Sequence, residues 1–353
     1  MTAPAALSST SQLLVVADPS QVGGARRAAA TLGSAQGLGE EAIGRLAIVV
    51  TEAATNIIRH AGSGQIVLRA FGGDSASGGG VEMLALDKGP GMADVRRAMR
   101  DGFSTFGSAG EGLGGIQRLS DTFGIYSQRN QGTVVLARIV EEFRVSDERR
   151  LPTIDDRVGV VCIPIRGEVE CGDAWRVVSG RHRLSFLLVD GLGHGPGAAS
   201  VAATATANFE ALAAPKAETA LAAMDSATRG TRGAAASVAV ISETTREVHF
   251  CGVGNVDGRV MDAQSTVHLV PQNGIVGHTL PTLRPTVHPW PHGARLVMHS
   301  DGVSARWRVD SYPGLAALHP ALMAGVIFRD FARERDDVTV LVYDDRAHAR
   351  RTL

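Results

Sequence analysis

Two polar residues one helical turn apart, Glu52 and Asn56, are the first candidates for chemistry in this chain. They lie in the segment TEAATNIIRHA at 51–61. Residues four apart on a helix project from one face. A carboxylate placed there can take a proton from a nucleophile, and the amide oxygen can bind Mg²⁺, which prefers oxygen ligands. On its own, this spacing favours a solvated polar helix face.

Two further motifs, both containing glycine, follow this segment. Asp87 ends the apolar run VEMLALD and stands just before Gly89 and Gly91. A carboxylate at a strand end, followed by glycines that let a ligand approach the backbone, suits recognition of an adenine amino group. A second glycine-rich stretch leads into a helix, where backbone N–H groups can bind phosphate, although alone it is also typical of a flexible loop. This stretch contains Gly107, Gly110, Gly112, Leu113, Gly114 and Gly115.

Acidic residues that stand beside glycine or beside a second acid recur in the C-terminal half. They are Asp173, Asp190, Asp301, Asp336 and Asp337. Asp190 and Asp301 each end an apolar run, which puts their carboxylates at strand tips. Carboxylates that converge from several strand tips can hold two divalent metal ions, which activate a water and bind phosphoryl oxygens, and all-oxygen ligands favour Mg²⁺ or Mn²⁺. A single Asp-Gly pair, by contrast, is typical of a turn.

Helices and strands that would position these residues alternate through the N-terminal half. Apolar residues at helical spacing predict helices over 19–32 and 39–60, and the hairpin signal RNQG joins two strands near residue 130. The charge-rich segment 141–156 is predicted to be a linker. The remaining predicted elements are strands over 65–71, 81–87, 123–128 and 133–139 and helices over 92–101 and 113–121.

The C-terminal half is predicted to be a layered β-sandwich with helices outside it, over 195–211, 216–229 and 314–333. Its strands are predicted over 158–165, 175–179, 183–190, 235–242, 246–252, 256–262, 294–299 and 338–343. The chain is therefore predicted to have an α+β fold with two domains. The predicted ranges are domains over 1–140 and 157–345, a linker over 141–156 and a tail over 346–353.

In this order, the three N-terminal motifs resemble those of the GHKL ATPases, whose domain is the Bergerat α/β sandwich. The resemblance covers about residues 10–140 and is strongest to the serine kinases and anti-sigma factors typified by RsbT and RsbW. It implies that ATP is bound, that Glu52 is the general base for a protein serine, and that Asn56 holds Mg²⁺. It also implies that Asp87, with Gly89 and Gly91, binds adenine. The phosphates would be bound by Gly110, Gly112, Leu113 and Gly114, and the GLGG spelling over 112–115 favours the RsbT side.

The order of the C-terminal acids resembles that of the metal-dependent PPM protein phosphatases, specifically their SpoIIE/RsbX branch. The resemblance covers about residues 157–345. It implies a β-sandwich flanked by helices, with Asp190 as the catalytic acid that bridges two metals and Gly191 lending a carbonyl. Asp301 and Asp336 would complete the metal ligands, with Asp337 as the alternative to Asp336. Asp173 would be a further ligand or would support the ligands from behind.

The composition excludes several other classes of protein. The 353 residues carry a formal net charge of −1 and scattered basic residues, which gives no sign of a nucleic-acid-binding surface. We see no signal peptide and no apolar run long enough to span a bilayer. Three cysteines are too few for a disulfide scaffold and fit a reducing compartment. We therefore expect a cytoplasmic protein that binds neither nucleic acid nor membranes.

Together, the two resemblances predict a bifunctional regulator. Its N-terminal half would phosphorylate a serine or threonine of a partner with ATP, and its C-terminal half would remove that phosphate by two-metal hydrolysis. The implied partner is a STAS-domain protein, either an anti-sigma antagonist or a stressosome component. One alternative is an ATP-gated phosphatase whose N-terminal half binds nucleotide without phosphotransfer. Another is an anti-sigma factor that binds a sigma factor, usually as a homodimer among RsbW-like proteins.

Overall fold

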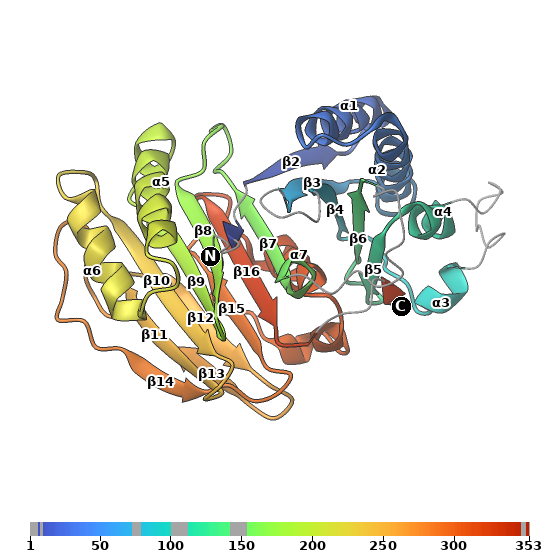
Figure 1. The fold of residues 1–353 in the computed structure, drawn as a ribbon. Helices are drawn as coiled ribbons and strands as arrows, with labels where there is room; N and C mark the ends of the chain where they lie inside the picture. The colour runs from blue at the N-terminus through green and yellow to red at the C-terminus, as the bar shows by residue number, and fades with distance from the viewer. Residues whose placement is uncertain are drawn as a thin grey trace. The chain divides into compact units, whose positions relative to one another are not determined.

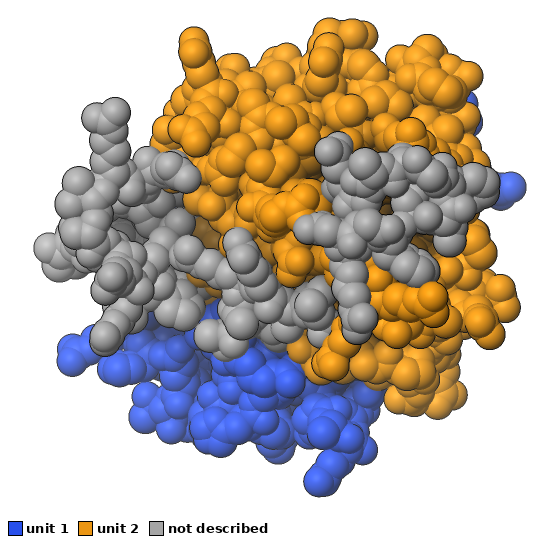
Figure 2. All heavy atoms as spheres, turned by 90° about the vertical axis from the view of Figure 1, so that its right-hand side faces the viewer, with its two compact units in different colours: residues 1–10, 157–307, 330–347 blue, residues 11–156, 308–329, 348–353 orange. Residues whose placement is uncertain are grey.

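The structure is a computed structural model that describes residues 6–7, 10–72, 79–99, 112–141, 154–346 and 351–352. These residues form two compact units, each drawn from three segments of the chain (Figure 1, Figure 2). Unit 1 comprises the described residues within Met1–Thr10, Arg157–Trp307 and Asp330–Ala347. Unit 2 comprises those within Ser11–Asp156, Arg308–Arg329 and His348–Leu353.

Unit 2 is built on a six-stranded sheet in the order β17-β5-β6-β4-β3-β2. Neighbouring strands are antiparallel except for the short parallel pair of β17 with β5. The strands are β2 (Ser11–Val16), β3 (Gly64–Phe71), β4 (Gly80–Asp87), β5 (Thr122–Ser127), β6 (Thr133–Val140) and β17 (Arg351–Thr352). The helices predicted over 19–32 and 39–60 are α1 (Pro19–Ala35) and α2 (Glu40–Ala61). The helix predicted over 92–101 is a single turn, α3 (Val95–Ala98), and the next is α4 (Gly112–Leu119).

Local signals explain where the two long helices begin and end. Asp18 caps α1, because its Oδ1 accepts a hydrogen bond from the Ser20 N–H at 2.8 Å. In turn, Gln21 Oε1 accepts a hydrogen bond from the Asp18 N–H at 3.0 Å, which completes a capping box. Helix α2 ends at Gly62, whose φ of 77° favours glycine. The inward faces of both helices pack on one face of the sheet in a single apolar core that includes Leu46, Val50 and Met83.

The other face of this sheet packs against α7 (Pro320–Phe331), a helix from far along the chain. A β-carbon built on Gly325 would lie 3.1 Å from Val134 and 3.2 Å from Leu86, and one built on Gly124 would lie 3.0 Å from Leu322. The glycines therefore allow helix and sheet to approach closely. This contact explains why Arg308–Arg329, which lies in the predicted range 157–345, belongs to unit 2.

A buried ion cluster also lies within unit 2. Glu82 on β4 accepts hydrogen bonds from Arg69 Nε at 3.1 Å and from Arg138 Nε at 2.7 Å. All three side chains are at most 3% exposed. Burial by itself raises the pKa of Glu82, but the two guanidinium groups lower it overall, so the carboxylate stays ionised. The sheet thus holds a satisfied charge cluster where an apolar residue would be expected.

Unit 1 contains two antiparallel sheets, in the orders β1-β8-β9-β10-β11-β14 and β13-β12-β15-β16-β7. The first sheet consists of β1 (Ala6–Leu7), β8 (Asp173–Gly180), β9 (Arg183–Gly191), β10 (Ala234–Ser242), β11 (Glu247–Val253) and β14 (Thr286–Pro289). The second consists of β7 (Val158–Ile163), β12 (Asp257–Met261), β13 (Thr266–Leu269), β15 (Arg295–His299) and β16 (Val338–Asp344). The rings of Phe186 on β9 and Tyr343 on β16 lie 4.9 Å apart, which joins the two sheets into a sandwich.

Helices α5 (Pro196–Ala211) and α6 (Ala217–Thr228) cover the outer face of the first sheet (Figure 1). Their buried residues, including Phe209 and Leu221, pack with Leu187 and Val238 of the strands. The edge strands β13 and β14 were not predicted, because the first is polar and the second lies among prolines. Cys162, Cys171 and Cys251 are buried free thiols.

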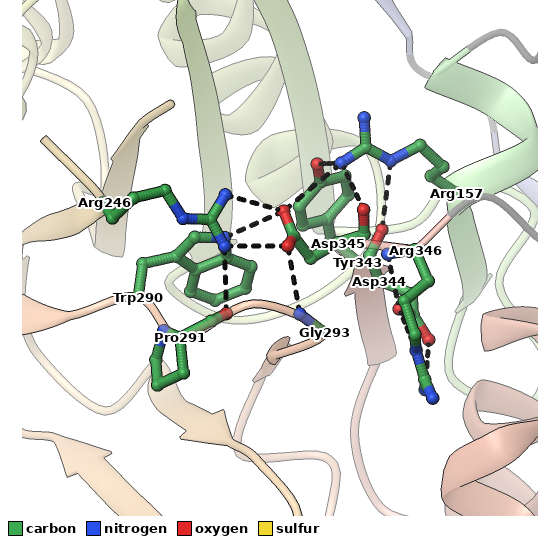
Figure 3. Close-up of polar contacts among 9 residues, drawn as sticks. All are labelled: Arg157, Arg246, Trp290, Pro291, Gly293, Tyr343, Asp344, Asp345 and Arg346. Atoms are coloured by element: carbon green, nitrogen blue, oxygen red, sulfur yellow. Dashed lines mark hydrogen bonds and ion pairs between the residues drawn. The ribbon is translucent and has the colours of Figure 1, made fainter. Parts of the chain in front are cut away.

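A polar network fixes the C-terminal end of β16 (Figure 3). The Asp345 carboxylate accepts hydrogen bonds from Arg246 Nη2 at 2.8 Å, from Trp290 Nε1 at 3.1 Å and from the Gly293 N–H at 3.1 Å. Burial alone would raise the pKa of Asp345, but these donors lower it. Because β16 begins directly after Asp336 and Asp337, this network anchors the strand that carries both acids into the sandwich. No helix in the described ranges has both the length and the apolar character needed to cross a lipid bilayer.

Candidate functional site

The predicted catalytic pair of unit 2 lies on one face of α2. Glu52 and Asn56 are both partly buried and one turn apart. A β-carbon built on Gly112, at the start of α4, would lie 3.3 Å from Asn56 Oδ1 and 3.4 Å from its Nδ2. That Nδ2 is buried and has no hydrogen-bond partner among the described residues. The structure thus brings the GLGG segment onto Asn56 and leaves the amide with hydrogen-bonding capacity for a ligand.

The remaining described residues predicted to bind phosphate lie on α4. Leu113 is partly buried against the apolar core, and Gly114 is buried inside the helix. Gly110 lies outside the described residues, as does Gly107. Gly112 therefore lies in direct contact with the Glu52–Asn56 face.

Asp87 ends β4 and is held by the backbone around it. Its Oδ1 accepts hydrogen bonds from the Gly89 N–H at 2.8 Å and from the Thr133 N–H at 3.2 Å. Both contacts fall on the same oxygen, so Oδ2 is the atom to which a ligand can donate. Burial raises the pKa of Asp87, although the two N–H donors and nearby cations oppose the shift.

Glycine is required at both predicted positions after Asp87. A β-carbon on Gly89 would lie 2.7 Å from Ala61 Cβ at the end of α2. Gly91 has a φ of 62°, and a β-carbon there would collide with the Gln128 carbonyl. The loop therefore runs between α2 and the β5–β6 hairpin with no room for side chains.

Two residues that sequence reasoning missed complete the surroundings of Asp87. Gly132 of the RNQG hairpin has a φ of 78°, and a β-carbon there would collide with the Asp87 carbonyl. Arg329 on α7 donates from Nη1 to the same carbonyl at 3.1 Å. The hairpin signal was visible in the sequence, whereas nothing local links Arg329 to a residue 242 positions earlier.

In unit 1, the predicted metal-binding acids converge from several elements. Asp173 and Asp190 are register partners on β8 and β9. Burial raises the pKa of Asp190 to about 9, with further contributions from the charges of Asp173, Asp301, Asp336 and Asp337. The direction of this shift agrees with the contacts: Asp173 faces Asp190 across the β8–β9 pair, and the Gly172 N–H next to Asp173 donates to Asp337 at 2.9 Å. A cation would stabilise carboxylates placed in this way.

Asp173 and Asp301 are each tied to a neighbouring polar residue. Ser300 Oγ donates to Asp173 Oδ2 at 2.6 Å, and Asn255 Nδ2 donates to Asp301 Oδ2 at 2.6 Å. The Oδ1 atoms of both acids are buried and accept no hydrogen bond from any described residue. Sequence reasoning missed both Ser300 and Asn255, and the glycine beside Asn255 is typical of a turn.

The adjacent acids Asp336 and Asp337 have different roles in the fold. Asp337 is buried, and its Oδ1 and Oδ2 accept hydrogen bonds from the Ile165 N–H at 2.7 Å and the Gly172 N–H at 2.9 Å. Asp336 is partly exposed. Burial is the largest cause of the raised pKa of Asp301, and the charge of Asp336 raises it further. Asp337 therefore holds backbone in place, and Asp336 faces the other carboxylates.

Gly191 closes the cluster where β9 meets α5. Its N–H donates to the Gly172 carbonyl at 3.0 Å, and a β-carbon on it would lie 2.5 Å from the Ala198 carbonyl oxygen. Only glycine fits this position, next to Asp190 and the loop that Asp337 holds.

The donor set of the cluster suits a hard divalent cation. All its side-chain donors are carboxylate oxygens, two of them buried without a partner, and oxygen donors are those preferred by Mg²⁺ and Mn²⁺. Among the described residues, however, no three His, Cys, Asp or Glu side chains are already gathered as a complete metal site. A bound cation would offset the repulsion among these carboxylates.

Comparison with known proteins agrees with this geometry. Residues 15–139 match the family described as histidine kinase-like ATPase domain, and residues 180–344 match stage II sporulation protein E (SpoIIE). Serine/threonine-protein kinase RsbT of Bacillus subtilis is 40% identical over 93 residues, which are 26% of this chain and 68% of RsbT. The chain is a fusion of an RsbT-like kinase domain and a SpoIIE-like phosphatase domain. Both the predicted fold class and the predicted family resemblances of this fusion are confirmed.

Solved structures resemble part of the fusion. A structure titled "The bacterial stressosome: a modular system that has been adapted to control secondary messenger signaling" is 27% identical, with a TM-score of 0.50. It covers 53% of this chain and 97% of its own. RsbX in complex with magnesium is 20% identical, with a TM-score of 0.48, and covers 55% of this chain and 98% of its own.

Proposed function

We propose that the fusion sets the phosphorylation level of a partner protein, with unit 2 adding phosphate to a serine or threonine and unit 1 removing it. The observation that carries the proposal is the contact between the segments that bear Asp173, Asp190, Asp301 and Asp336, in a chain that also retains the Glu52–Asn56 pair. The Glu52–Asn56 pair fits the addition of phosphate, and the carboxylate cluster fits its removal. The comparisons support both families.

In the proposed kinase reaction, the γ-phosphoryl group passes from ATP to the partner hydroxyl, and ADP leaves. Glu52 takes the hydroxyl proton as the new P–O bond forms. Asp87 accepts a hydrogen bond from the adenine amino group at Oδ2, with Gly89 and Gly91 keeping the approach open. Asn56 would hold Mg²⁺, which supplies charge neutralisation at the phosphates when bound. Gly110, Gly112, Leu113 and Gly114 would bind the phosphates.

In the proposed phosphatase reaction, water displaces the partner oxygen from the phosphoryl group. Asp190, the Gly191 carbonyl, Asp301 and Asp336 would hold two divalent cations. When bound, Mg²⁺ or Mn²⁺ lowers the pKa of a water and balances phosphoryl charge. Asp173 would support these ligands from the first sheet. Its Oδ2 accepts a hydrogen bond from Ser300 Oγ, which in turn accepts one from the Thr339 N–H at 3.0 Å.

The proposed partner is a STAS-domain protein, as an anti-sigma antagonist or a stressosome component in the cytoplasm. Support comes from the similarity to RsbT and to a stressosome structure. A phosphate monoester adds close to two negative charges at about pH 7, enough to make or break a protein contact. Two opposed activities on one chain would set how long that charge persists.

Separate assays of the two halves test the proposal. Glu52→Gln should keep ATP affinity, because Asp87 and the glycine-rich stretch are intact, but should lose transfer to the partner. Hydrolysis of a generic phosphate monoester with Mn²⁺ should remain at the wild-type rate in the same variant. Loss of hydrolysis together with transfer would contradict two independent sites, and wild-type transfer in Glu52→Gln would remove Glu52 as the base.

A further inference from the structure

The segment DGLGHGPG at 190–197 has glycine at every second position, and the proposed metal chemistry uses only its first two residues. The other glycines make room for side chains from elsewhere. Gly195 has a φ of 68°, and a β-carbon on it would lie 2.8 Å from the Glu168 carboxylate. Gly193 and Gly197 both lie against Arg232.

The Arg232 guanidinium extends across this glycine run. A β-carbon on Gly197 would lie 2.8 Å from Cζ and 3.0 Å from Nε, and one on Gly193 would lie 3.1 Å from Nη1. The backbone on both sides of this contact is joined, because the Leu192 N–H donates to the Gly233 carbonyl at 3.0 Å. The side chain therefore rests on backbone that only glycine leaves open.

This location is at the rim of the carboxylate cluster. Gly191 and Asp190 are register partners of Ala234 and Ala235, the residues that follow Arg232 and Gly233 along the chain. A β-carbon on Gly172 would lie 2.7 Å from Asp337 Oδ2 and 3.5 Å from the Gly193 carbonyl oxygen. The loop beneath the guanidinium is thus in contact with the backbone that Asp337 holds.

Arg232 differs from the other arginines near it. It is exposed, and its guanidinium makes no hydrogen bond or ion pair with any residue that the structure describes. Arg229 is paired with Asp225 at 3.3 Å, and the charge of Arg333 lowers the pKa of Asp301. Glu168, the acid that lies against Gly195, is 2.9 Å from His194 Nδ1. Among the described residues, the Arg232 guanidinium therefore lies beside the glycine run without an acidic partner.

We propose that Arg232 binds the phosphoryl group of the substrate, a dianionic phosphate monoester, beside the carboxylate cluster. This inference rests on the proposed phosphatase function of unit 1. A guanidinium presents two parallel N–H donors that match two phosphoryl oxygens, and it offsets the repulsion that a dianion meets near several carboxylates. The glycine run leaves room for the Arg232 guanidinium to lie along the backbone beside the cluster.

Arginine substitutions with a matched control test this assignment. The assays are hydrolysis of p-nitrophenyl phosphate with Mn²⁺, inhibition by inorganic phosphate, and calorimetric binding of inorganic phosphate to the Mn²⁺-loaded protein. Arg232→Ala should raise KM, the phosphate inhibition constant and the phosphate Kd by about ten- to a hundredfold, as for loss of a charge-assisted hydrogen bond. The kcat should fall less than KM rises, and Arg232→Lys should recover part of the loss. Arg229→Ala, an exposed arginine three residues earlier, should match wild type in all three.

A second variant moves the guanidinium without removing its charge. Gly197→Ala puts a methyl group where the Arg232 guanidinium now lies, in the first turn of α5, where alanine is a good helix former. It should weaken phosphate binding while leaving thermal stability and Mn²⁺ affinity unchanged. Wild-type KM and phosphate affinity in Arg232→Ala would overturn the proposal. If wild type hydrolyses nothing, the phosphatase function fails instead, and calorimetry with inorganic phosphate still decides whether Arg232 binds it.

Discussion

Removing each of the two neighbouring acids, Asp336 and Asp337, should affect a different property of unit 1. Loss of Asp337 should lower the stability of the fold, and loss of Asp336 should weaken metal binding. Asp337→Ala should destabilise unit 1, because the Ile165 and Gly172 N–H groups lose their acceptors. A buried donor left unpaired costs about 1–3 kcal/mol, so the two together cost about 2–6 kcal/mol. Removing the repulsion between Asp337 and Asp336 offsets part of this. We expect a net loss of about 2–3 kcal/mol in the free energy of unfolding.

Asp336→Ala is the matched control, one residue away and with the same change in side chain. Asp336 accepts a hydrogen bond from the Asp337 N–H at 2.9 Å and is partly exposed, so water can replace its carboxylate there. Its removal also relieves repulsion with Asp301. Metal-free stability should therefore stay within about 1 kcal/mol of wild type, while Mn²⁺ binding and hydrolysis are lost.

Urea unfolding in the presence of a chelator, followed by calorimetric Mn²⁺ titration of the folded variants, separates the two effects. The reasoning predicts a lower midpoint with Asp337→Ala and a weaker Mn²⁺ affinity with Asp336→Ala. A wild-type urea midpoint for Asp337→Ala, combined with complete loss of Mn²⁺ binding, would refute it. That result would make Asp337 the ligand and Asp336 the supporting residue.

Three further predictions concern other parts of the chain. The pKa of Asp190, about 9 in the folded protein against an ordinary 3.8, means that the folded state holds more protons than the unfolded state between these values. Metal-free stability should therefore fall as pH rises through this window, by at most about 1.4 kcal/mol per pH unit for one group, and Asp190→Asn should flatten the slope in urea unfolding. Arg329→Met should weaken ATP binding several-fold in calorimetry, because the Asp87 carbonyl loses its donor, whereas unchanged affinity would make the contact purely structural. Asp345→Ala should lower the unfolding free energy by about 2–4 kcal/mol in thermal or urea unfolding, since Arg246, Trp290 and Gly293 lose a common acceptor.

Much of the candidate site could be predicted because its signals are local. An apolar run followed by an acid makes a strand with a carboxylate at its tip, which held for Asp190 on β9. In the same way, helical spacing placed Glu52 and Asn56 on one face of α2. These inferences need only the geometry of one element.

Other features depend on contacts between distant segments and had no local signal. The position of α7 against the sheet of unit 2 and the hydrogen bond from Arg329 to Asp87 follow from packing across the whole chain. The choice between Asp336 and Asp337 depends on which way each side chain points, and neighbouring residues at a strand start point in opposite directions. The repeated glycines over 190–197 were visible in the sequence. Their contact with Arg232 was not, because it depends on the pairing of β10 with β9.

The most direct test of the account follows phosphate on a partner over time. The substrate would be a STAS-domain protein encoded by a gene close to the gene of this protein. It would be incubated with labelled ATP, Mg²⁺ and Mn²⁺ in the presence of either the wild-type protein or the Asp190→Ala variant. The account predicts that label rises and then falls with wild type, once ATP is exhausted, and that it rises and stays with Asp190→Ala. Label that falls equally in both proteins would contradict the assignment of hydrolysis to the carboxylate cluster. No label in either would contradict phosphorylation of that partner by unit 2.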